Sequence, residues 1–274
     1  MSIIAIAPTF GSEGRAIGRA LAQALEYRFI DREIILKAAE EHHIQTEKLE
    51  QVDERGLSFW ERLYEEKRKY LIFIESAVFE LAEPGDVVIV GRGATILVAD
   101  IEHALRIRTI APSEIRVRRI MARENLDKRS AAARVKTVDR EYASRIEYLY
   151  GLDWTLPELY DLVLNTAREP FGWAVEALAH LVRTERYRPT ESSLQKMRDL
   201  TLASQVRAAL AADPTTGNAN IEVVAREGSV QLKGVVFSSS MLEAAAKVAE
   251  RVPGVRTVSW EAVEIPQIYP GPMM

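Results

Sequence analysis

The sequence predicts an α/β protein with a parallel sheet flanked by helices, followed by a second, small α+β domain. Over residues 1–185, short apolar runs bounded by Gly, Pro or Asp alternate with helical patterns, which favours parallel strands joined by crossover helices. A polar stretch containing a proline follows at 186–194 and is interpreted as a linker. Beyond it, over 195–265, the order changes to helix, hairpin, helix, strand.

Four runs in the first part are too short for helices and rich in β-branched residues, so each is predicted to be a buried strand. These runs are 3–7, 87–90, 105–110 and 162–164. Between them, apolar residues recur at helical spacing. The helical stretches are 14–25, 70–81, 115–121 and 129–149.

The second part predicts a helix from about 195 to 212, strands at 221–225 and 229–236, a helix at about 239–251 and a strand at 256–263. The tail, 266–274, contains several prolines and is expected to be irregular.

Composition excludes several function classes. The chain has 274 residues, 47% hydrophobic and 28% charged, which argues against wholesale disorder. It has no cysteine, so disulfides, thiolate metal sites and thiol nucleophiles are excluded, and four histidines disfavour a histidine metal cage. A net charge of −4 disfavours nucleic acid as a partner. Without a signal-peptide pattern or an apolar run of about 18 residues, the sequence predicts a cytoplasmic protein with no transmembrane segment.

The small net charge hides two opposite blocks. Residues 40–66 hold nine acidic and three basic side chains, whereas residues 106–145 hold twelve basic and five acidic ones. Such blocks are either solvated helix faces or complementary binding surfaces.

The clearest motif follows the first strand at 9–16, where a turn with Gly11 and Gly14 leads directly into a helix. Strand, glycine turn and helix form the geometry in which backbone N–H groups hold phosphate oxygens, although a plain tight turn has the same pattern. Arg15 and Ala16 occupy the Lys and Ser/Thr places of the strict phosphate-loop motif. Arg15 can donate to phosphate, but Ala16 cannot bind Mg²⁺.

A second candidate is Arg92, which follows the strand at 87–90 and would point into the crevice where open α/β sheets bind ligands. A surface arginine in a loop is the alternative. Arginines then recur along the helical pattern from 116 to 145. A helical hairpin that brings arginines over a transferring phosphate would have this composition.

Residues 1 to about 183 resemble the cytidylate kinase-like group of nucleoside monophosphate kinases, which share the P-loop kinase fold. The segments that carry the resemblance are Phe-Gly-Ser-Glu-Gly-Arg (10–15), Tyr-Arg-Phe-Ile-Asp-Arg-Glu (27–33), Gly-Arg-Gly-Ala (91–94), the arginine helix 116–119, Asp-Arg-Glu (139–141), Tyr-Gly-Leu-Asp-Trp (150–154) and Tyr-Asp-Leu-Val-Leu-Asn-Thr (160–166).

The resemblance implies phosphoryl transfer from ATP to a nucleoside monophosphate such as CMP or dCMP. An acceptor-binding insert at about 32–80 would close against an arginine-rich lid at about 113–150. Mg²⁺ is expected as a cofactor, without a clear protein ligand. The implied ATP-binding residues are Gly11, Ser12, Glu13, Gly14, Arg15 and Ala16. The implied acceptor-binding residues are Asp31 and Arg92, and the implied catalytic residues are Arg15, Arg116, Arg119 and Arg140.

Three features depart from the family pattern. Gly93 stands where the pattern of true cytidylate kinases has Asp, the pair Arg15-Ala16 replaces Lys-Gly or Lys-Thr, and Glu13 replaces a frequent Gly. These departures leave a second hypothesis open, a nucleotide-binding regulator without turnover.

Residues about 198–265 resemble a BON domain. The matching segments are Gly-Ser-Val-Gln-Leu-Lys-Gly-Val (228–235), the alanine-rich helix at 244–249 and Val-Pro-Gly-Val-Arg-Thr-Val (252–258). The resemblance implies a phospholipid or protein partner, which defines a third hypothesis in which the protein acts through this domain. Residues 196–264 carry eight basic and eight acidic side chains, so charge offers no case for an anionic membrane.

Overall fold

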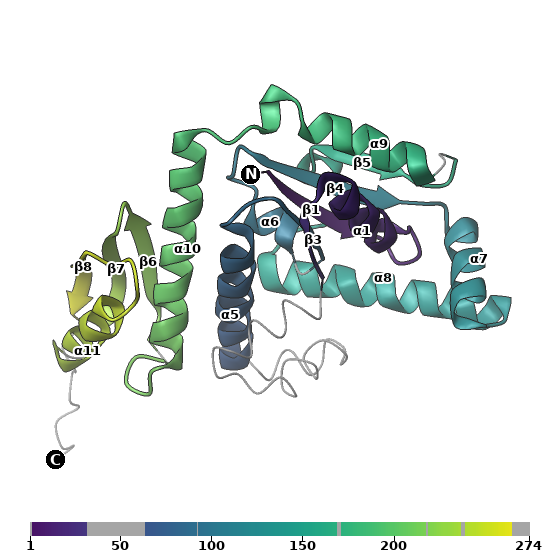
Figure 1. Ribbon diagram of the computed structural model, residues 1–274. Coiled ribbons are helices and arrows are strands. Elements are labelled where there is room, and N and C mark those ends of the chain that lie inside the picture. Colours follow the sequence, from purple (N-terminus) through teal and green to yellow (C-terminus); the bar gives the residue numbers. More distant parts are fainter. Residues whose placement is uncertain are drawn as a thin grey trace, which may run out of the picture.

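A computed structural model of the chain describes residues 2–31, 64–91, 93–168, 171–217, 219–236 and 239–264. The larger unit is a sheet of five parallel strands in the order β2-β3-β1-β4-β5 (Figure 1). The strands are β1 (Ile3–Pro8), β2 (Arg28–Ile30), β3 (Val87–Val90), β4 (Ala104–Ile110) and β5 (Leu162–Asn165). The predicted parallel α/β sheet is confirmed, with β2 as an additional strand that is only three residues long and lies at an edge.

Helices cover both faces of this sheet. On one face, α1 (Gly14–Leu25) and α9 (Phe171–Val182) pack against Ile4 and Ile6 of β1. On the other face, α5 (Tyr64–Ala82) and the short α6 (Ala94–Leu97) pack against Ile3 and Ala5. Successive side chains of β1 point to opposite faces, so its continuous apolar run fills two cores, as expected for a buried parallel strand.

Two helices between β4 and β5 form a hairpin, here called the arginine hairpin: α7 (Ser113–Glu124) and α8 (Lys128–Tyr150). Asp127 caps α8 by accepting hydrogen bonds from the amides of Arg129 and Ser130, and Gly151 ends it with φ 68°. The helix α8 runs along the sheet from α7 toward α6 (Figure 1).

The C-terminal unit has the predicted order of elements (Figure 1). Its elements are α10 (Glu191–Ala212), β6 (Ile221–Arg226), β7 (Ser229–Val236), α11 (Ser239–Glu250) and β8 (Thr257–Glu264). β6 and β7 pair antiparallel, and β8 pairs parallel to β7. The turn between β6 and β7 has positive φ at Glu227 and Gly228, which suits a tight hairpin.

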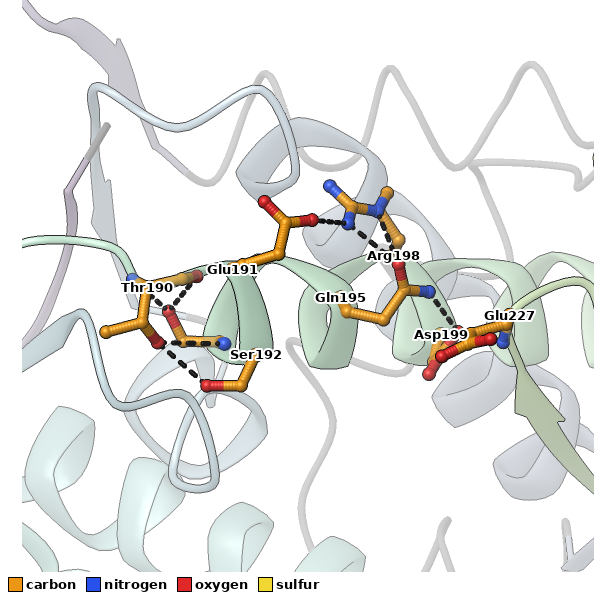
Figure 2. A network of polar contacts seen from close by, with 8 residues as sticks. Thr190, Glu191, Ser192, Gln195, Arg198, Asp199 and Glu227 are labelled. Atoms are coloured by element: carbon orange, nitrogen blue, oxygen red, sulfur yellow. Dashed lines mark hydrogen bonds and ion pairs between the residues drawn. The ribbon is translucent and has the colours of Figure 1, made fainter.

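The helix α10 begins at Glu191, earlier than the predicted start near 195, because the polar stretch before it supplies a cap. Thr190 and Ser193 bond each other's backbone amides in a capping box. Figure 2 shows further contacts along α10, where Arg198 bonds Glu191 and Gln195, and the Asp199 carboxylate accepts from the Glu227 amide at 2.8 Å. This last bond ties α10 to the β6–β7 turn.

Several sequence predictions lie outside the described residues: Arg92, the tail 266–274 and most of the acceptor insert, of which α5 is the described part. Within the described part of the chain, no helix is long and apolar enough to span a membrane.

Candidate nucleotide site

The glycine loop connects β1 to α1 and is held against β4. The amide of Thr9 donates to the Thr109 carbonyl at 3.0 Å, and the buried Ser12 hydroxyl bonds the Thr9 carbonyl at 2.7 Å and Thr109 Oγ1 at 2.8 Å. A Cβ at Gly14 would lie 2.3 Å from Thr109 Oγ1, so only glycine permits this approach. Contacts with Thr109 of β4 therefore hold the backbone of the loop in this conformation.

The loop presents amide groups at the carboxyl edge of the sheet. Among the described residues, the amides of Gly11, Glu13 and Gly14 donate to no backbone carbonyl. The first turn of any helix leaves its N–H groups without intrahelical partners, and the helix dipole favours an anion there. The loop and the start of α1 together have the geometry of a phosphate-binding turn.

The structure brings together two predicted site residues that the resemblance assigns to different ligands. Arg15 Nη2 lies 2.5 Å from Asp31 Oδ2, and Arg19 Nη2 lies 3.9 Å from the same oxygen. The Asp31 side chain is 8% exposed, whereas that of Arg15 is 53% exposed. The Arg15 guanidinium is thus beside the loop but directed to a carboxylate.

Arg116 reaches the loop from α7. Its Nη1 donates to the Phe10 carbonyl at 3.1 Å and lies 2.5 Å from Asp139 Oδ2 on α8. The other oxygen of Asp139 accepts from the Phe10 amide at 3.3 Å. Each helix of the arginine hairpin therefore forms a hydrogen bond with the backbone of Phe10, α7 with its carbonyl and α8 with its amide.

Arg119, one turn further along α7, is also directed to protein groups. Its Nη1 donates to the Gly11 carbonyl at 3.3 Å and to Thr166 Oγ1 at 2.9 Å, and its Nη2 donates to the Thr166 carbonyl at 2.7 Å. Its Nε lies 3.3 Å from the Glu13 carboxylate. Arg119 thus links the glycine loop to the end of β5.

Phe10 joins the loop to the arginine hairpin by apolar contact. It packs against the cluster of Val117, Ile120, Ala131 and Val135 from α7 and α8. The guanidinium groups of Arg123 and Arg134 lie 5.0 and 5.8 Å from its ring centroid. Arg140, the remaining predicted catalytic arginine, is exposed on α8 next to Asp139.

The loop that follows β3 explains the presence of Gly93, one of the departures from the family pattern. Gly93 has φ 72°, and a Cβ there would lie 2.7 Å from Tyr150 Oη at the end of α8. An Asp at this position would carry both the strain of positive φ and the collision with the tyrosine ring. Tyr150 therefore occupies the space that an acidic side chain at position 93 would need.

Sequence reasoning missed a buried arginine beneath the end of α8. Arg108, on β4, is 9% exposed; its guanidinium lies 4.7 Å from the Trp154 ring centroid, and it donates to the Thr155 carbonyl. Tyr160 Oη donates to the Trp154 carbonyl at 2.6 Å. These contacts fix the segment between α8 and β5. The signal was present in the sequence, because Arg106 and Arg108 both fall inside a stretch predicted to be a buried strand.

The residues around the loop do not supply a direct ligand for Mg²⁺. Ala16 has no side-chain oxygen, and the Ser12 hydroxyl already has two partners. The carboxylates of Glu13, Asp31 and Asp139 each face an arginine. Across the described ranges, no three His, Asp or Glu side chains are grouped as metal ligands.

Comparison with known proteins agrees with this geometry. The model of the cytidylate kinase-like family matches residues 3–168, and the BON domain model matches residues 198–266. A cytidylate kinase of Methanopyrus kandleri is 33% identical over 129 residues, which cover 43% of this chain and 67% of that protein. A cytidylate kinase of Methanocaldococcus jannaschii is 35% identical over 113 residues, 40% of this chain and 60% of that protein.

The crystal structure of an uncharacterized protein from Eubacterium ventriosum superposes with a TM-score of 0.55 at 18% identity, covering 68% of this chain and 100% of that one. At that identity the likeness shows the fold alone. The family model, by contrast, spans more than half of the sequence, including the glycine loop and the arginine hairpin. The chain therefore belongs to the cytidylate kinase-like family.

Proposed function

We propose that the chain transfers the γ-phosphoryl group of ATP to a nucleoside monophosphate, with CMP or dCMP as the acceptor. The observation that carries this proposal is the contact between the glycine loop and the arginine hairpin: Arg116 and Arg119 both donate to loop carbonyls, at Phe10 and Gly11. Phosphoryl transfer is catalysed mainly by positioning and charge neutralisation, which is what amides and arginines provide.

In the proposed step, an oxygen of the acceptor phosphate attacks the γ-phosphorus of ATP. The bond from that phosphorus to the β–γ bridging oxygen breaks, ADP leaves, and the acceptor becomes a nucleoside diphosphate. The amides of Gly11, Glu13 and Gly14 would hold the donor phosphates. Arg15 and Arg119 would exchange their carboxylate partners, Asp31 and Glu13, for phosphate oxygens, since guanidinium binds both groups in the same bidentate geometry.

On the acceptor side, Asp31 and Arg92 are proposed to hold the monophosphate, as the family resemblance implies. Arg140 is proposed to neutralise the transferring group, because it is exposed on α8 beside the residue that clamps the loop. Mg²⁺ would arrive with the ATP phosphates and keep water as its other ligands, which this ion readily does.

A coupled assay of ADP release with CMP, dCMP, UMP and AMP tests the proposal. Substitution R140Q is expected to lower kcat by about 100-fold, the usual cost of one charge-stabilising group in a transition state. K136Q, a change at another exposed residue of the same helix, is the control and should leave kcat unchanged. No turnover with any acceptor, together with intact nucleotide binding, would reject the kinase reaction.

A specific observation favours a second candidate, a nucleotide-binding regulator without turnover. Arg15 and Arg119 are both neutralised by carboxylates, and Ala16 offers no oxygen to a metal. Thermal shift with ATP and CMP, with and without Mg²⁺, separates the candidates. An ATP affinity that increases with Mg²⁺ supports the enzyme. An ATP affinity that is the same with and without Mg²⁺ supports the regulator.

For the whole chain we propose a nucleotide-binding domain at 1–185, a linker at 186–194 whose last four residues already belong to α10, a BON-like domain at 195–265 and a tail. The BON-like domain would bind a protein or a lipid. Co-sedimentation of the full chain with neutral and anionic liposomes tests the lipid partner. Absence from both pellets would remove the hypothesis that the protein acts on membranes.

A further inference from the structure

The helix α10 belongs to two hydrophobic cores at once. One side packs Leu202, Val206 and Leu210 against the small sheet of the C-terminal unit. On the other side, Met197, which is 1% exposed, joins the core formed by α5, β3 and β1. Further along, Ala208 and Ala211 pack against Phe73 of α5. A displacement of α10 therefore disturbs the packing of both units, because close-packed interiors transmit strain.

Polar contacts fix the position of α10 on α5. Arg207 Nη1 lies 3.2 Å from Glu75 Oε2, and both side chains are less than one third exposed. Burial raises the pKa of Glu75, although Arg207 opposes this shift. Near Arg207, and lining the same small pocket of this α5–α10 seam, Arg68 of α5 donates to the Gly217 carbonyl at 2.5 Å and to the Ala219 carbonyl, both in the connection from α10 to β6.

Within the nucleotide-binding domain, α10 packs chiefly against α5, which lies on the acceptor side of the proposed kinase site. The helix α5 is the described part of the predicted acceptor segment 32–80, and β3 leads into the loop at 91–93. The same core contains Ala94 and Val98, which follow that loop. The five-stranded sheet separates α10 from α7, the helix that reaches the glycine loop (Figure 1).

From this arrangement we propose that the C-terminal unit regulates the acceptor side of the site. The seam between α10 and α5 couples the conformation of the small β6–β8 sheet to the affinity for the nucleoside monophosphate. Affinity for ATP is unchanged. The part that concerns the acceptor rests on the proposed function. The coupling itself is a property of the seam, and it operates in both directions, because a coupling free energy between two binding sites is reciprocal.

The substitution R207M tests the proposal. It keeps most of the side-chain volume and leaves Glu75 without its cationic partner at the seam. E222Q is the matched control, since Glu222 is an exposed charge on β6 of the same unit, paired in register with Lys233 of β7. Calorimetric titration of the full-length chain with CMP and with ATP gives the two affinities separately. We expect R207M to weaken CMP binding by about fivefold or more, a size typical of coupling between sites, with ATP affinity unchanged. Equal changes for both nucleotides, or none for CMP, would overturn the proposal.

Hydrogen exchange without any nucleotide separates this proposal from the kinase reaction. R207M should speed amide exchange in both α5 and the β6–β7 hairpin. In E222Q, the amides of α5 should exchange at the same rate as in the unsubstituted chain. Unchanged exchange in α5 of R207M would overturn the coupling whether or not the chain is a kinase. Conversely, coupled exchange without turnover on any acceptor would reject the kinase reaction and retain the coupling.

Discussion

Arg116 and Asp139 form an ion pair of 2.5 Å that encloses the backbone of Phe10: the guanidinium donates to its carbonyl and the carboxylate accepts from its amide. The arginine side chain is 13% exposed and the aspartate 27%. The pair joins α7 to α8 and both to the glycine loop. Its first role is thus to hold the loop, before any phosphate is bound.

Substitution D139N should loosen the glycine loop. The amide side chain can still accept from the Phe10 amide, but it leaves the Arg116 guanidinium without its counter-charge, at a cost of about 1–3 kcal/mol. We expect a lower urea midpoint and ATP binding weakened by about 30-fold, which corresponds to the middle of that range. E147Q, an exposed change on the same helix, is the control. Unaltered ATP affinity in D139N would show that the clamp does not order the site.

Substitution E13Q should strengthen ATP binding. Glu13 places a carboxylate on the loop at 3.3 Å from Arg119 Nε, where it competes with phosphate oxygens for the guanidinium. Since charged contacts near a protein surface are worth about 1 kcal/mol, we expect the ATP dissociation constant to fall by about fivefold at low salt.

Glu26 provides a close control for this change. It also has a left-handed backbone, with φ 60° against 62° for Glu13, but it lies at the opposite end of α1. E26Q should leave the ATP dissociation constant unchanged. Weaker ATP binding in E13Q would mean that the carboxylate assists the site instead of competing with phosphate.

Substitutions at two glycines separate backbone strain from steric conflict. Gly93 and Gly151 have similar positive φ values of 72° and 68°, but a Cβ at Gly151 would meet nothing within 4 Å, whereas one at Gly93 would meet the Tyr150 ring. G151A should cost about 1–2 kcal/mol from strain alone, and G93A should cost about 1–3 kcal/mol more. Urea unfolding measures both.

The double substitution G93A with Y150A tests the cause. Removal of the ring opens the space that the new methyl group needs, so the extra cost of G93A should fall in the Y150A background. Strict additivity of the two changes would show that Tyr150 is not what excludes a side chain at position 93.

His103 should make the docking of α10 sensitive to acid. Its ring is 1% exposed, and Nδ1 lies 2.9 Å from Ser193 Oγ at the start of α10. Burial lowers its pKa below 6.5, and the N-terminal amino group lowers it further against an opposing effect of Glu102. Between the folded and unfolded pKa values the unfolded chain binds more protons, so stability present above pH 6.5 is lost as the pH falls.

The urea midpoint should therefore decrease between pH 7 and pH 5.5 more steeply for the unsubstituted chain than for H103N, which retains a polar side chain but does not titrate. Parallel pH profiles for the two proteins would assign the acid sensitivity to other groups.

Much of the fold follows from local patterns. Continuous apolar runs predict β1 and β3, because a parallel strand buried on both faces has no polar alternation. The strands β4 and β5 are predicted by shorter apolar stretches, which two arginines interrupt in β4. Positions of glycine predict the phosphate-binding turn and the β6–β7 hairpin, because few other residues adopt positive φ at low cost. The three-residue strand β2 was missed, since so short a segment has no measurable period.

The sequence by itself thus determined four of the five strands of the large sheet, the order of elements in the small domain, the glycine loop at the first strand end and the arginine content of the hairpin above it. Only the tertiary structure decided the partners of those charges: Arg15 with Asp31, Arg119 with Glu13, and Arg116 with Asp139. It also showed that α10 completes two cores, where the sequence predicted a helix of the small domain alone. Periodicity reports which face of an element is apolar, whereas the identity of the partner depends on packing between residues far apart in the chain.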